Sequence, residues 1–234
     1  MAIKILELGL VINNNVLILA DFHIGLEEAL NKEGVLIPRN QFRDIVERLK
    51  KILGNTKFKK IIINGDLKHE FGTISKQEWK QTLLLLDMLS RHSEKIILVK
   101  GNHDTIIGPI AEKRKVEVVD EILVGKNLIC HGHKISRSKN FQKADTIVIG
   151  HEHPSISVRE GPRAEKFKCF LFGKYKGKKL IVMPSFNPLI EGTDVAKEQL
   201  LSPYIKNVEN FKVVIVTDYG ETFDFDKVGE LKNV

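Results

Sequence analysis

The chain has little of what marks secreted and membrane-spanning proteins. It contains 234 residues but only two cysteines, Cys130 and Cys169, too few for a disulfide scaffold or a thiolate zinc site. We expect both to be reduced, buried thiols, with a single disulfide bridge as the alternative. The longest apolar runs, such as residues 16–20, are far too short to cross a bilayer. Glu7 interrupts the N-terminal stretch that a signal peptide would need to be apolar, so we expect a cytoplasmic protein with no membrane partner.

Aromatic residues are also scarce, at 7% of the chain with a single tryptophan, whereas charged residues make up 29% and apolar residues 42%. This balance is typical of a soluble globular protein and excludes extensive disorder. The formal net charge of +7 is concentrated in residues 134–179, which hold 12 basic and 4 acidic side chains. Such a region could bind a polyanion such as nucleic acid. Because Lys174-Tyr-Lys-Gly-Lys-Lys179 looks like a turn between two strands, a solvated hairpin is the simpler interpretation of this stretch alone.

Short runs rich in β-branched residues predict buried strands. They are residues 16–20, 60–63, 95–99, 127–130 and 146–149. Continuous rather than alternating apolar runs of this length are typical of strands covered on both faces. Amphipathic patterns predict helices over roughly 39–53, which begins after Pro38 and ends at Gly54, and over 76–90. Strand–helix alternation in the first half indicates an α/β domain.

The second half of the chain has a different pattern, with strands joined by tight turns. The strands expected here are residues 156–160, 166–175, 178–183, 211–217 and 221–226. Lys176-Gly177 and Tyr219-Gly220 predict hairpin turns, and the run of asparagines at 13–15 predicts another near the N-terminus. We therefore expect one domain, residues 1–234, with two packed sheets flanked by helices.

Each of the five buried runs is followed by a polar cluster. The clusters are Asp21-Phe22-His23, Gly65-Asp66, Gly101-Asn102-His103-Asp104, His131-Gly132-His133 and Gly150-His151-Glu152-His153. Taken singly, each is most simply a turn or a cap. Together they contain six of the eight histidines, and every cluster follows a buried strand. Because ligands bind beyond the carboxyl ends of strands in α/β sheets, the clusters could form one metal site.

The clusters occur in the order found in calcineurin-like metallophosphoesterases, and the chain resembles that family from residue 21 to residue 153. Residues 64–72 and 183–192 look more narrowly like the archaeal phosphoesterases related to SbcD-type DNA repair nucleases. The resemblance implies a four-layer α/β/β/α sandwich with two mixed β-sheets. It also implies a hydrolase of phosphoric esters.

The resemblance further implies a centre of two divalent metal ions. One ion would be held by Asp21, His23, Asp66 and His153, and the other by Asp66, Asn102, His131 and His151. Mixed carboxylate, amide and imidazole ligands suit Mn²⁺, Fe or Zn²⁺, and Mn²⁺ is the ion we expect from the resemblance. His133 is not assigned, and Cys130 should face away from its neighbour His131.

By the same resemblance, a hydroxide activated by the two metals would attack phosphorus in line. His103 would stabilise the transition state or protonate the leaving oxygen. Asp104 could orient His103, or it could simply cap a following helix. Glu152 is expected to be a solvated loop residue, and Phe186 and Asn187 form a rigid segment that could approach the substrate.

The substrate is less well defined than the site. Where related repair nucleases carry a second Asp after Gly-Asp, this chain has Lys68-His69-Glu70. A nuclease-related phosphodiesterase acting on DNA or RNA is our leading hypothesis. The alternatives are a phosphomonoesterase or small-nucleotide hydrolase, and a non-catalytic scaffold of the same fold. The oligomeric state stays open, a homodimer included.

Overall fold

The computed structural model describes residues 2–160 and 162–231, which divide into two compact units. The first unit is Met1–Asp120 with Phe186–Leu189, and the second is Glu121–Ser185 with Ile190–Val234. Each unit contains its own β-sheet, and each sheet mixes parallel with antiparallel pairs. The expected α/β fold with two mixed sheets is therefore confirmed.

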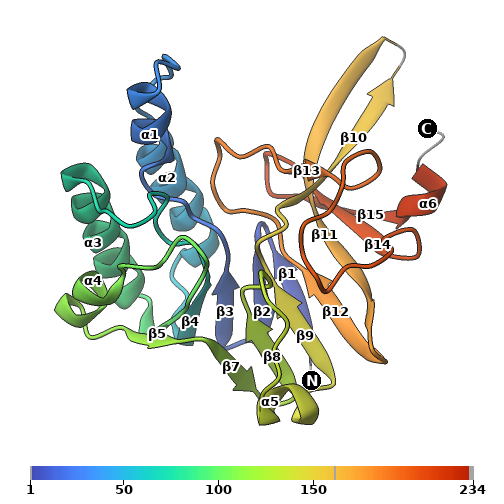
Figure 1. Ribbon diagram of the computed structural model, residues 1–234, viewed down its shortest axis with the longest axis horizontal. Coiled ribbons are helices and arrows are strands. Elements are labelled where there is room, and N and C mark those ends of the chain that lie inside the picture. Colours follow the sequence, from blue (N-terminus) through green and yellow to red (C-terminus); the bar gives the residue numbers. More distant parts are fainter. Residues whose placement is uncertain (1, 161, 232–234) are drawn as a thin grey trace. The chain divides into compact units, whose positions relative to one another are not determined.

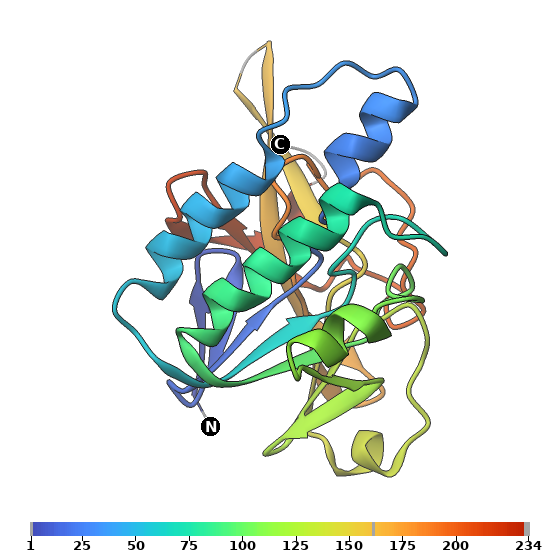
Figure 2. The same cartoon turned by 90° about the vertical axis from the view of Figure 1, so that its left-hand side faces the viewer.

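The first unit consists of a six-stranded sheet and helices that lie along it. Its elements are β1 (Ile3–Leu6), β2 (Gly9–Ile12), β3 (Val16–Leu19), α1 (Leu26–Lys32), α2 (Gln41–Leu53), β4 (Phe58–Asn64), α3 (Lys76–Ser90), β5 (Ser93–Val99), α4 (Gly108–Lys113) and β6 (Glu117–Val119). The strands pair in chain order, antiparallel from β1 to β3 and parallel from β3 to β6. Helices α2 and α3 run side by side over one face of this sheet (Figures 1 and 2).

Local sequence explains the two long helices. In α2 the buried side chains include Ile45, Leu49 and Ile52, spaced by one or two helical turns, and Gly54 ends the helix with a φ of 46°. In α3 the N-cap Ser75 and Glu78 form a capping box, in which each side chain binds the other residue's backbone N–H. The expected helices at 39–53 and 76–90 are therefore both present, the first beginning two residues later.

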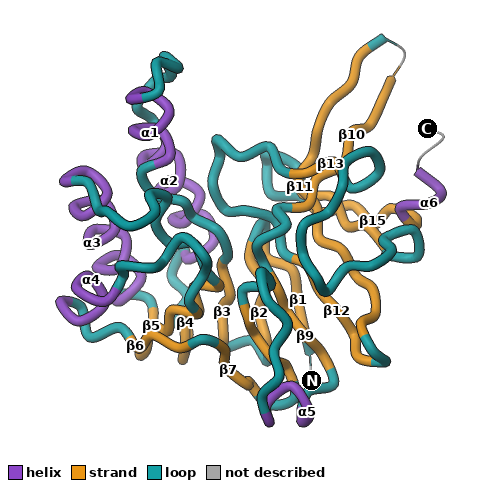
Figure 3. Tube along the Cα trace, in the orientation of Figure 1, coloured by secondary structure: helices purple, strands orange, loops and turns teal. Residues whose placement is uncertain are grey.

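The second unit consists of a nine-stranded sheet with two short helices. Its elements are β7 (Glu121–Val124), β8 (Asn127–Cys130), α5 (Lys139–Lys143), β9 (Thr146–Ile149), β10 (Pro154–Glu160), β11 (Arg163–Tyr175), β12 (Lys178–Val182), β13 (Thr193–Asp194), β14 (Lys212–Val216), β15 (Thr222–Lys227) and α6 (Val228–Leu231). The strand order is β13-β10-β11-β12-β9-β8-β7, with β14 pairing β11 and β15. The β10–β11 hairpin extends beyond the other strands of this sheet (Figures 1 and 3).

The expected strands of the second half are all present with boundaries shifted by up to three residues. The turns at Lys176-Gly177 and residues 13–15 join β11 to β12 and β2 to β3. The sequence did not predict the short helices α1, α4, α5 and α6, because four to seven residues carry too little periodicity to be recognised. Among the described residues, no helix is both long and apolar enough to cross a membrane.

Candidate functional site

Three of the polar clusters follow β3, β4 and β5, which are parallel neighbours in the first unit. Asp21, Asp66 and Asn102 therefore come from strand ends at one edge of that sheet. Backbone hydrogen bonds hold the first two loops together: the N–H of Asp21 donates to the carbonyl of Gly65 at 3.2 Å, and the N–H of His23 donates to that of Asp66 at 2.8 Å. The sheet thus fixes these side chains before any ligand binds.

Asp66 is the centre of this group. Its Oδ1 accepts a hydrogen bond from the His103 N–H at 2.8 Å, and its Oδ2 lies 3.7 Å from Nε2 of His23 and 3.9 Å from Nε2 of His103. A Cβ on Gly101 would lie 2.1 Å from Asp66 Oδ1, which explains the glycine that opens this cluster. Asp21 and Asp66 are both buried. Burying two carboxylates is costly unless donors or positive charge compensate, and a bound cation would provide such compensation.

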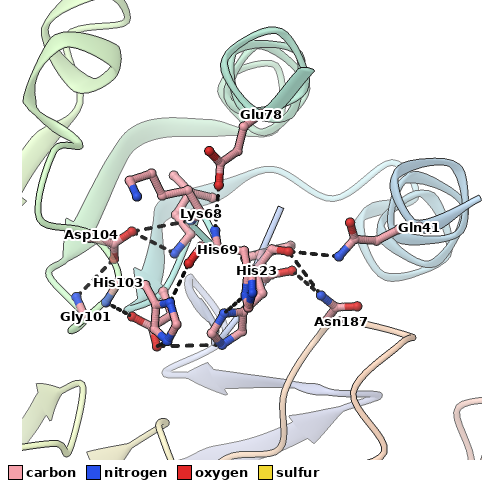
Figure 4. Close-up of polar contacts among 12 residues, drawn as sticks. His23, Gln41, Lys68, His69, Glu78, Gly101, His103, Asp104 and Asn187 are labelled. Atoms are coloured by element: carbon pink, nitrogen blue, oxygen red, sulfur yellow. Dashed lines mark hydrogen bonds and ion pairs between the residues drawn. The ribbon is translucent and has the colours of Figure 1, made fainter. Parts of the chain in front are cut away.

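Asp104 connects two of these loops. Its Oδ2 accepts from the N–H of Gly101 at 3.0 Å, while Oδ1 accepts from the N–H groups of Leu67 at 3.0 Å and Lys68 at 3.4 Å (Figure 4). It does not cap the following helix, since α4 begins at Gly108 with Ile107 as its N-cap. The capping interpretation is therefore wrong. Asp104 instead fixes the loop after β5 against the loop after β4.

His69, which the sequence analysis left without a role, lies in the same group. Its Nδ1 is 3.4 Å from Nδ1 of His23, and its ring stacks on that of His103 with centroids 5.3 Å apart. One nitrogen from each of these three histidines lies within 4.8 Å of the others. Burial, reinforced by the charge of His103, lowers the pKa of His69. The only sequence signal was the departure from the family pattern at residues 68–70.

The His69 backbone also orients His103. The carbonyl oxygen of His69 lies 2.5 Å from Nδ1 of His103 (Figure 4). Because a carbonyl can only accept, Nδ1 of His103 carries the proton, and Nε2 is the nitrogen left for chemistry. The orienting contact of His103 is therefore a backbone carbonyl.

Glu78 of α3 fixes the loop that carries His69. Its Oε1 accepts from the N–H groups of His69 and Glu70, each at 2.9 Å, and its Oε2 accepts from the N–H of Ser75 at 3.3 Å. Burial raises the pKa of the Glu78 carboxyl, an effect that these backbone donors and the charge of Lys68 oppose. The capping box of α3 thus continues into the candidate site.

The His23 loop is held by side-chain amides. Gln41 of α2 donates to the carbonyl of His23 at 2.9 Å, and Asn187 donates to that of Phe22 at 2.9 Å. Phe186, the residue before Asn187, is fully buried with its ring centroid 4.9 Å from that of Phe22. The expectation that Phe186 and Asn187 approach the substrate is wrong, because both side chains are buried in supporting the His23 loop.

The other two clusters follow β8 and β9, which are parallel neighbours in the second unit. The N–H of Gly150 donates to the carbonyl of His131 at 2.9 Å, so the two loops leave the sheet together. The His131 ring centroid lies 5.3 Å from that of His133 and 5.0 Å from that of His151. His153 follows on the same loop. The second unit therefore gathers its own group of imidazoles.

Glu152, expected to be solvated, is buried. Its Oε2 accepts from the N–H groups of Leu201 at 2.9 Å and Ser202 at 2.7 Å. The Ser202 hydroxyl in turn donates to the carbonyl of Gly132 at 2.9 Å. Burial raises the pKa of the Glu152 carboxyl, and the two backbone donors oppose this effect. The expectation was wrong because burial by a loop some fifty residues away leaves no local sequence pattern.

The two cysteines are buried and form no disulfide bridge with each other, as expected. Cys130 lies with its Sγ 3.6 Å from the Tyr204 hydroxyl. Burial raises the pKa of the Cys130 thiol to about 12, and burial also raises the pKa of Cys169. Both thiols are therefore protonated and unreactive near neutral pH.

Comparison with known proteins identifies the family. The family profile described as calcineurin-like phosphoesterase matches residues 15–218, which include all five polar clusters. The chain belongs to the calcineurin-like phosphoesterases. A search of curated proteins finds no match.

A search of solved structures finds matches to this calcineurin-like phosphoesterase. The nuclease MPE of Pseudomonas putida is 18% identical with a TM-score of 0.69, and the match covers 96% of this chain and 95% of that one. A Vps29 single mutant from Entamoeba histolytica is 16% identical with a TM-score of 0.40, covering 90% and 99%. Vps29 from Cryptosporidium parvum is 16% identical with a TM-score of 0.40, covering 91% and 97%. At 18% identity, the likeness to the nuclease MPE concerns the fold alone.

Backbone conformation distinguishes the family's ligand positions in this chain. Of the ten non-glycine residues with positive φ in the described chain, five are predicted metal ligands. They are Asp21 (56°), His23 (43°), Asp66 (46°), His151 (66°) and His153 (49°). Side chains rarely adopt this left-handed region, and residues held there concentrate at functional sites. The backbone is thus strained where the ligands are expected.

Calcineurin-like phosphoesterases act with divalent metal ions, and the described residues include His and Asp groups that could hold one. The first unit offers carboxylates, the Asn102 amide and imidazoles, and the second offers imidazoles. This donor set fits borderline metals such as Mn²⁺, Fe or Zn²⁺. The family and the donors together indicate a metal-dependent hydrolase of phosphoric esters.

Proposed function

We propose that the chain is a dinuclear, metal-dependent phosphodiesterase related to nucleases. The observation that carries this proposal is the positive φ of five of the seven expected metal ligands, in a chain that belongs to the calcineurin-like phosphoesterases. A non-catalytic scaffold would have no need to retain this strain. We further propose that the two units act as one domain, residues 1–234, because the family profile extends across both.

The ligand assignment follows the family order. Asp21, His23, Asp66 and His153 would hold one ion. Asp66, Asn102, His131 and His151 would hold the other, so that Asp66 serves both. We expect Mn²⁺, with Fe or Zn²⁺ as alternatives. When bound, the metals neutralise charge on the phosphoryl oxygens and lower the pKa of a coordinated water molecule.

His103 is the proposed catalytic side chain. Its Nδ1–H is held by the His69 carbonyl, which leaves Nε2 to deliver a proton to the leaving oxygen. The Asp66 Oδ2 lies 3.9 Å from this Nε2. Asp104 contributes by fixing the loop on which His103 lies.

A phosphodiester fits the charge of the second unit better than a small neutral ester does. Most basic side chains of residues 134–179 are exposed, namely Lys134, Arg137, Lys139, Lys143, Arg159, Arg163, Lys174, Lys176 and Lys179. Exposed cations of this number would attract a polyanionic strand. The nuclease named for the P. putida structure suggests the same substrate class. The narrower kinship with archaeal SbcD-related proteins, and a cytoplasmic location, stay predictions from sequence.

A hydrolysis panel tests this function. Purified protein with Mn²⁺ should cleave single-stranded DNA, duplex DNA or RNA faster than cyclic nucleotides or phosphomonoesters, and EDTA should abolish cleavage. Affinity for the preferred strand should fall steeply with salt. A preference for phosphomonoesters would contradict the phosphodiesterase assignment. Failure to bind any metal at high supply would indicate a scaffold.

A further inference from the structure

Phe71 is an exposed aromatic side chain beside the proposed catalytic histidine. Its ring centroid lies 3.8 Å from that of His103, with the planes at 36°. Yet Phe71 is 56% exposed, and it is the one aromatic residue among the exposed large hydrophobic side chains described in the first unit. One side of the ring is thus covered by His103 while much of its surface faces solvent. An exposed ring held beside the proposed catalytic side chain is therefore available to contact a bound substrate.

The loop that presents Phe71 is fixed on both sides. Before it, Glu78 accepts hydrogen bonds from the backbone of His69 and Glu70, and the buried Lys68 ammonium donates to the Glu70 carbonyl. After it, the N–H of Gly72 donates to the Thr105 hydroxyl at 3.3 Å. Figure 4 shows Glu78, Lys68 and His69 grouped beside His103. A preorganised ring binds with little loss of conformational entropy.

The chemistry of the leaving group indicates what this ring contacts. If His103 protonates the leaving oxygen, then whatever is attached to that oxygen must pass close to Phe71. In a nucleic acid strand that group is a nucleoside, and its base is a flat ring able to stack on an aromatic side chain. Bases inside a duplex are already stacked on one another and are not available to Phe71.

We propose that Phe71 is a specificity-determining residue that stacks on the unpaired nucleobase at the leaving side of the cleaved phosphodiester. The substrate class is therefore single-stranded nucleic acid, DNA or RNA. This inference rests on the proposed phosphodiesterase function. It also places base stacking beside the proposed catalytic histidine rather than in the basic stretch.

A binding experiment without metal tests the stacking directly. The chain has one tryptophan, Trp79, so Phe71→Trp in a Trp79→Phe background places a single fluorescent reporter at the site. In EDTA, oligothymidylate and oligouridylate are titrated in parallel with an equally long strand of abasic units. We expect quenching and tighter binding with at least one base-bearing strand, and neither with the abasic strand.

Kinetics with added Mn²⁺ complete the test. Phe71→Ala should raise KM for the preferred base-bearing strand by roughly tenfold, while the rate on the abasic strand stays at the wild-type value. Leu36→Ala is the matched control, since Leu36 is 90% exposed and lies outside the site. It should leave both rates unchanged.

The outcomes separate the two proposals. If wild-type protein cleaves no strand, base-bearing or abasic, the phosphodiesterase function fails. If wild-type protein and Phe71→Ala each cleave the base-bearing and the abasic strand equally well, the phosphodiesterase function stands and the stacking inference is overturned. Equal quenching by base-bearing and abasic strands would overturn it as well. If only the DNA strand or only the RNA strand binds more tightly than the abasic strand, stacking is supported and the preferred nucleic acid is identified.

Discussion

The two units differ in the side chains that the proposed ligand assignment takes from each. The first would provide Asp21, Asp66 and the Asn102 amide together with His23, whereas the second would provide only imidazoles, from His131, His151 and His153. In that assignment, negative ligand charge comes entirely from the first unit. Because carboxylates attract a cation at long range and imidazoles do not, the first unit should dominate metal affinity. The second should complete the coordination geometry.

The units also differ in how they support their ligands. In the first, side chains of α2 and α3 reach the loops: Gln41 binds the His23 carbonyl and Glu78 binds the backbone of the His69 loop. In the second, a long loop performs this task, with Glu152 binding the backbone at Leu201 and Ser202. Gln41 and Glu78 lie on helices, whereas the loop at Leu201 and Ser202 is irregular and is held by these hydrogen bonds and by the packing of the neighbouring Tyr204 in the core. The comparison predicts different consequences for equivalent substitutions.

Removing the shared carboxylate should have the largest effect. Asp66→Asn keeps an oxygen that can accept from the His103 N–H but loses the negative charge. We expect both metal sites to weaken by roughly 100-fold or more and hydrolysis to be lost. Metal content by mass spectrometry checks this, with His151→Gln as the matched change in the second unit. If His151→Gln loses as much metal as Asp66→Asn, the first unit does not dominate affinity.

Replacing His103 should lower the rate without releasing metal. For His103→Ala we expect a loss of roughly 10²–10⁴-fold in kcat on a strand with a poor leaving group. An activated 4-nitrophenyl phosphodiester, whose leaving oxygen needs no proton, should be affected far less. Kinetics on both substrates with metal content measured in parallel provide the test. An equal loss on both would indicate that His103 stabilises charge and donates no proton.

The strands, and the polar clusters that follow them, could be recognised from the sequence because both leave local patterns. Continuous β-branched runs identified β3, β4, β5, β8 and β9. Because β3, β4 and β5 are parallel neighbours in one sheet, and β8 and β9 in the other, the clusters that follow them lie at one edge of each sheet. The glycine before Asn102 was also visible, and the structure explains it by the close approach of Asp66.

The supporting side chains could not be predicted, because their partners are distant in sequence. Asn187 lies 165 residues from Phe22, whose carbonyl it binds. Glu152 and Phe186 looked like loop residues but are buried by segments that no local window contains. His69 was visible only as a departure from the family pattern, and its contact with His103 comes from the pairing of loops after β4 and β5.

Truncating the two supporting carboxylates should separate their roles. Glu152→Ala leaves the buried N–H of Ser202 and the N–H of Leu201 without their acceptor, at a cost of about 1–3 kcal/mol in unfolding free energy, and should lower metal occupancy. Glu78→Ala should cost a similar amount but act on kcat, since it frees the His69 loop that orients His103. Urea unfolding, metal content and kcat are measured for each, with Glu→Gln variants as controls that retain an acceptor. Identical effects on metal content would contradict the division between the units.

The smallest expected effect concerns Asp194, the second residue of β13. This strand contacts the His153 loop, because the N–H of Thr193 donates to the His153 carbonyl at 2.9 Å. Burial alone would raise the pKa of Asp194. Hydrogen bonds from the Ser157 hydroxyl at 2.6 Å and the Ala196 N–H at 3.1 Å, together with the Lys197 ammonium 3.3 Å from Oδ2, outweigh this effect, so the pKa is lowered. The carboxylate therefore stabilises the fold above the ordinary Asp pKa of about 3.9, and this contribution is lost as the pH falls through the lower folded-state value.

Asp194→Asn should accordingly lower the unfolding free energy by about 1 kcal/mol at pH 7, with the difference from wild type shrinking below pH 4. Urea unfolding at pH 7, 5 and 3 measures this. The control is Asp145→Asn, which removes an exposed ion pair with Lys126 and should change stability by less than about 0.5 kcal/mol at any pH. If Asp194→Asn lowered the unfolding free energy equally at all three pH values, the packing of the Asp194 side chain rather than its charge would stabilise β13.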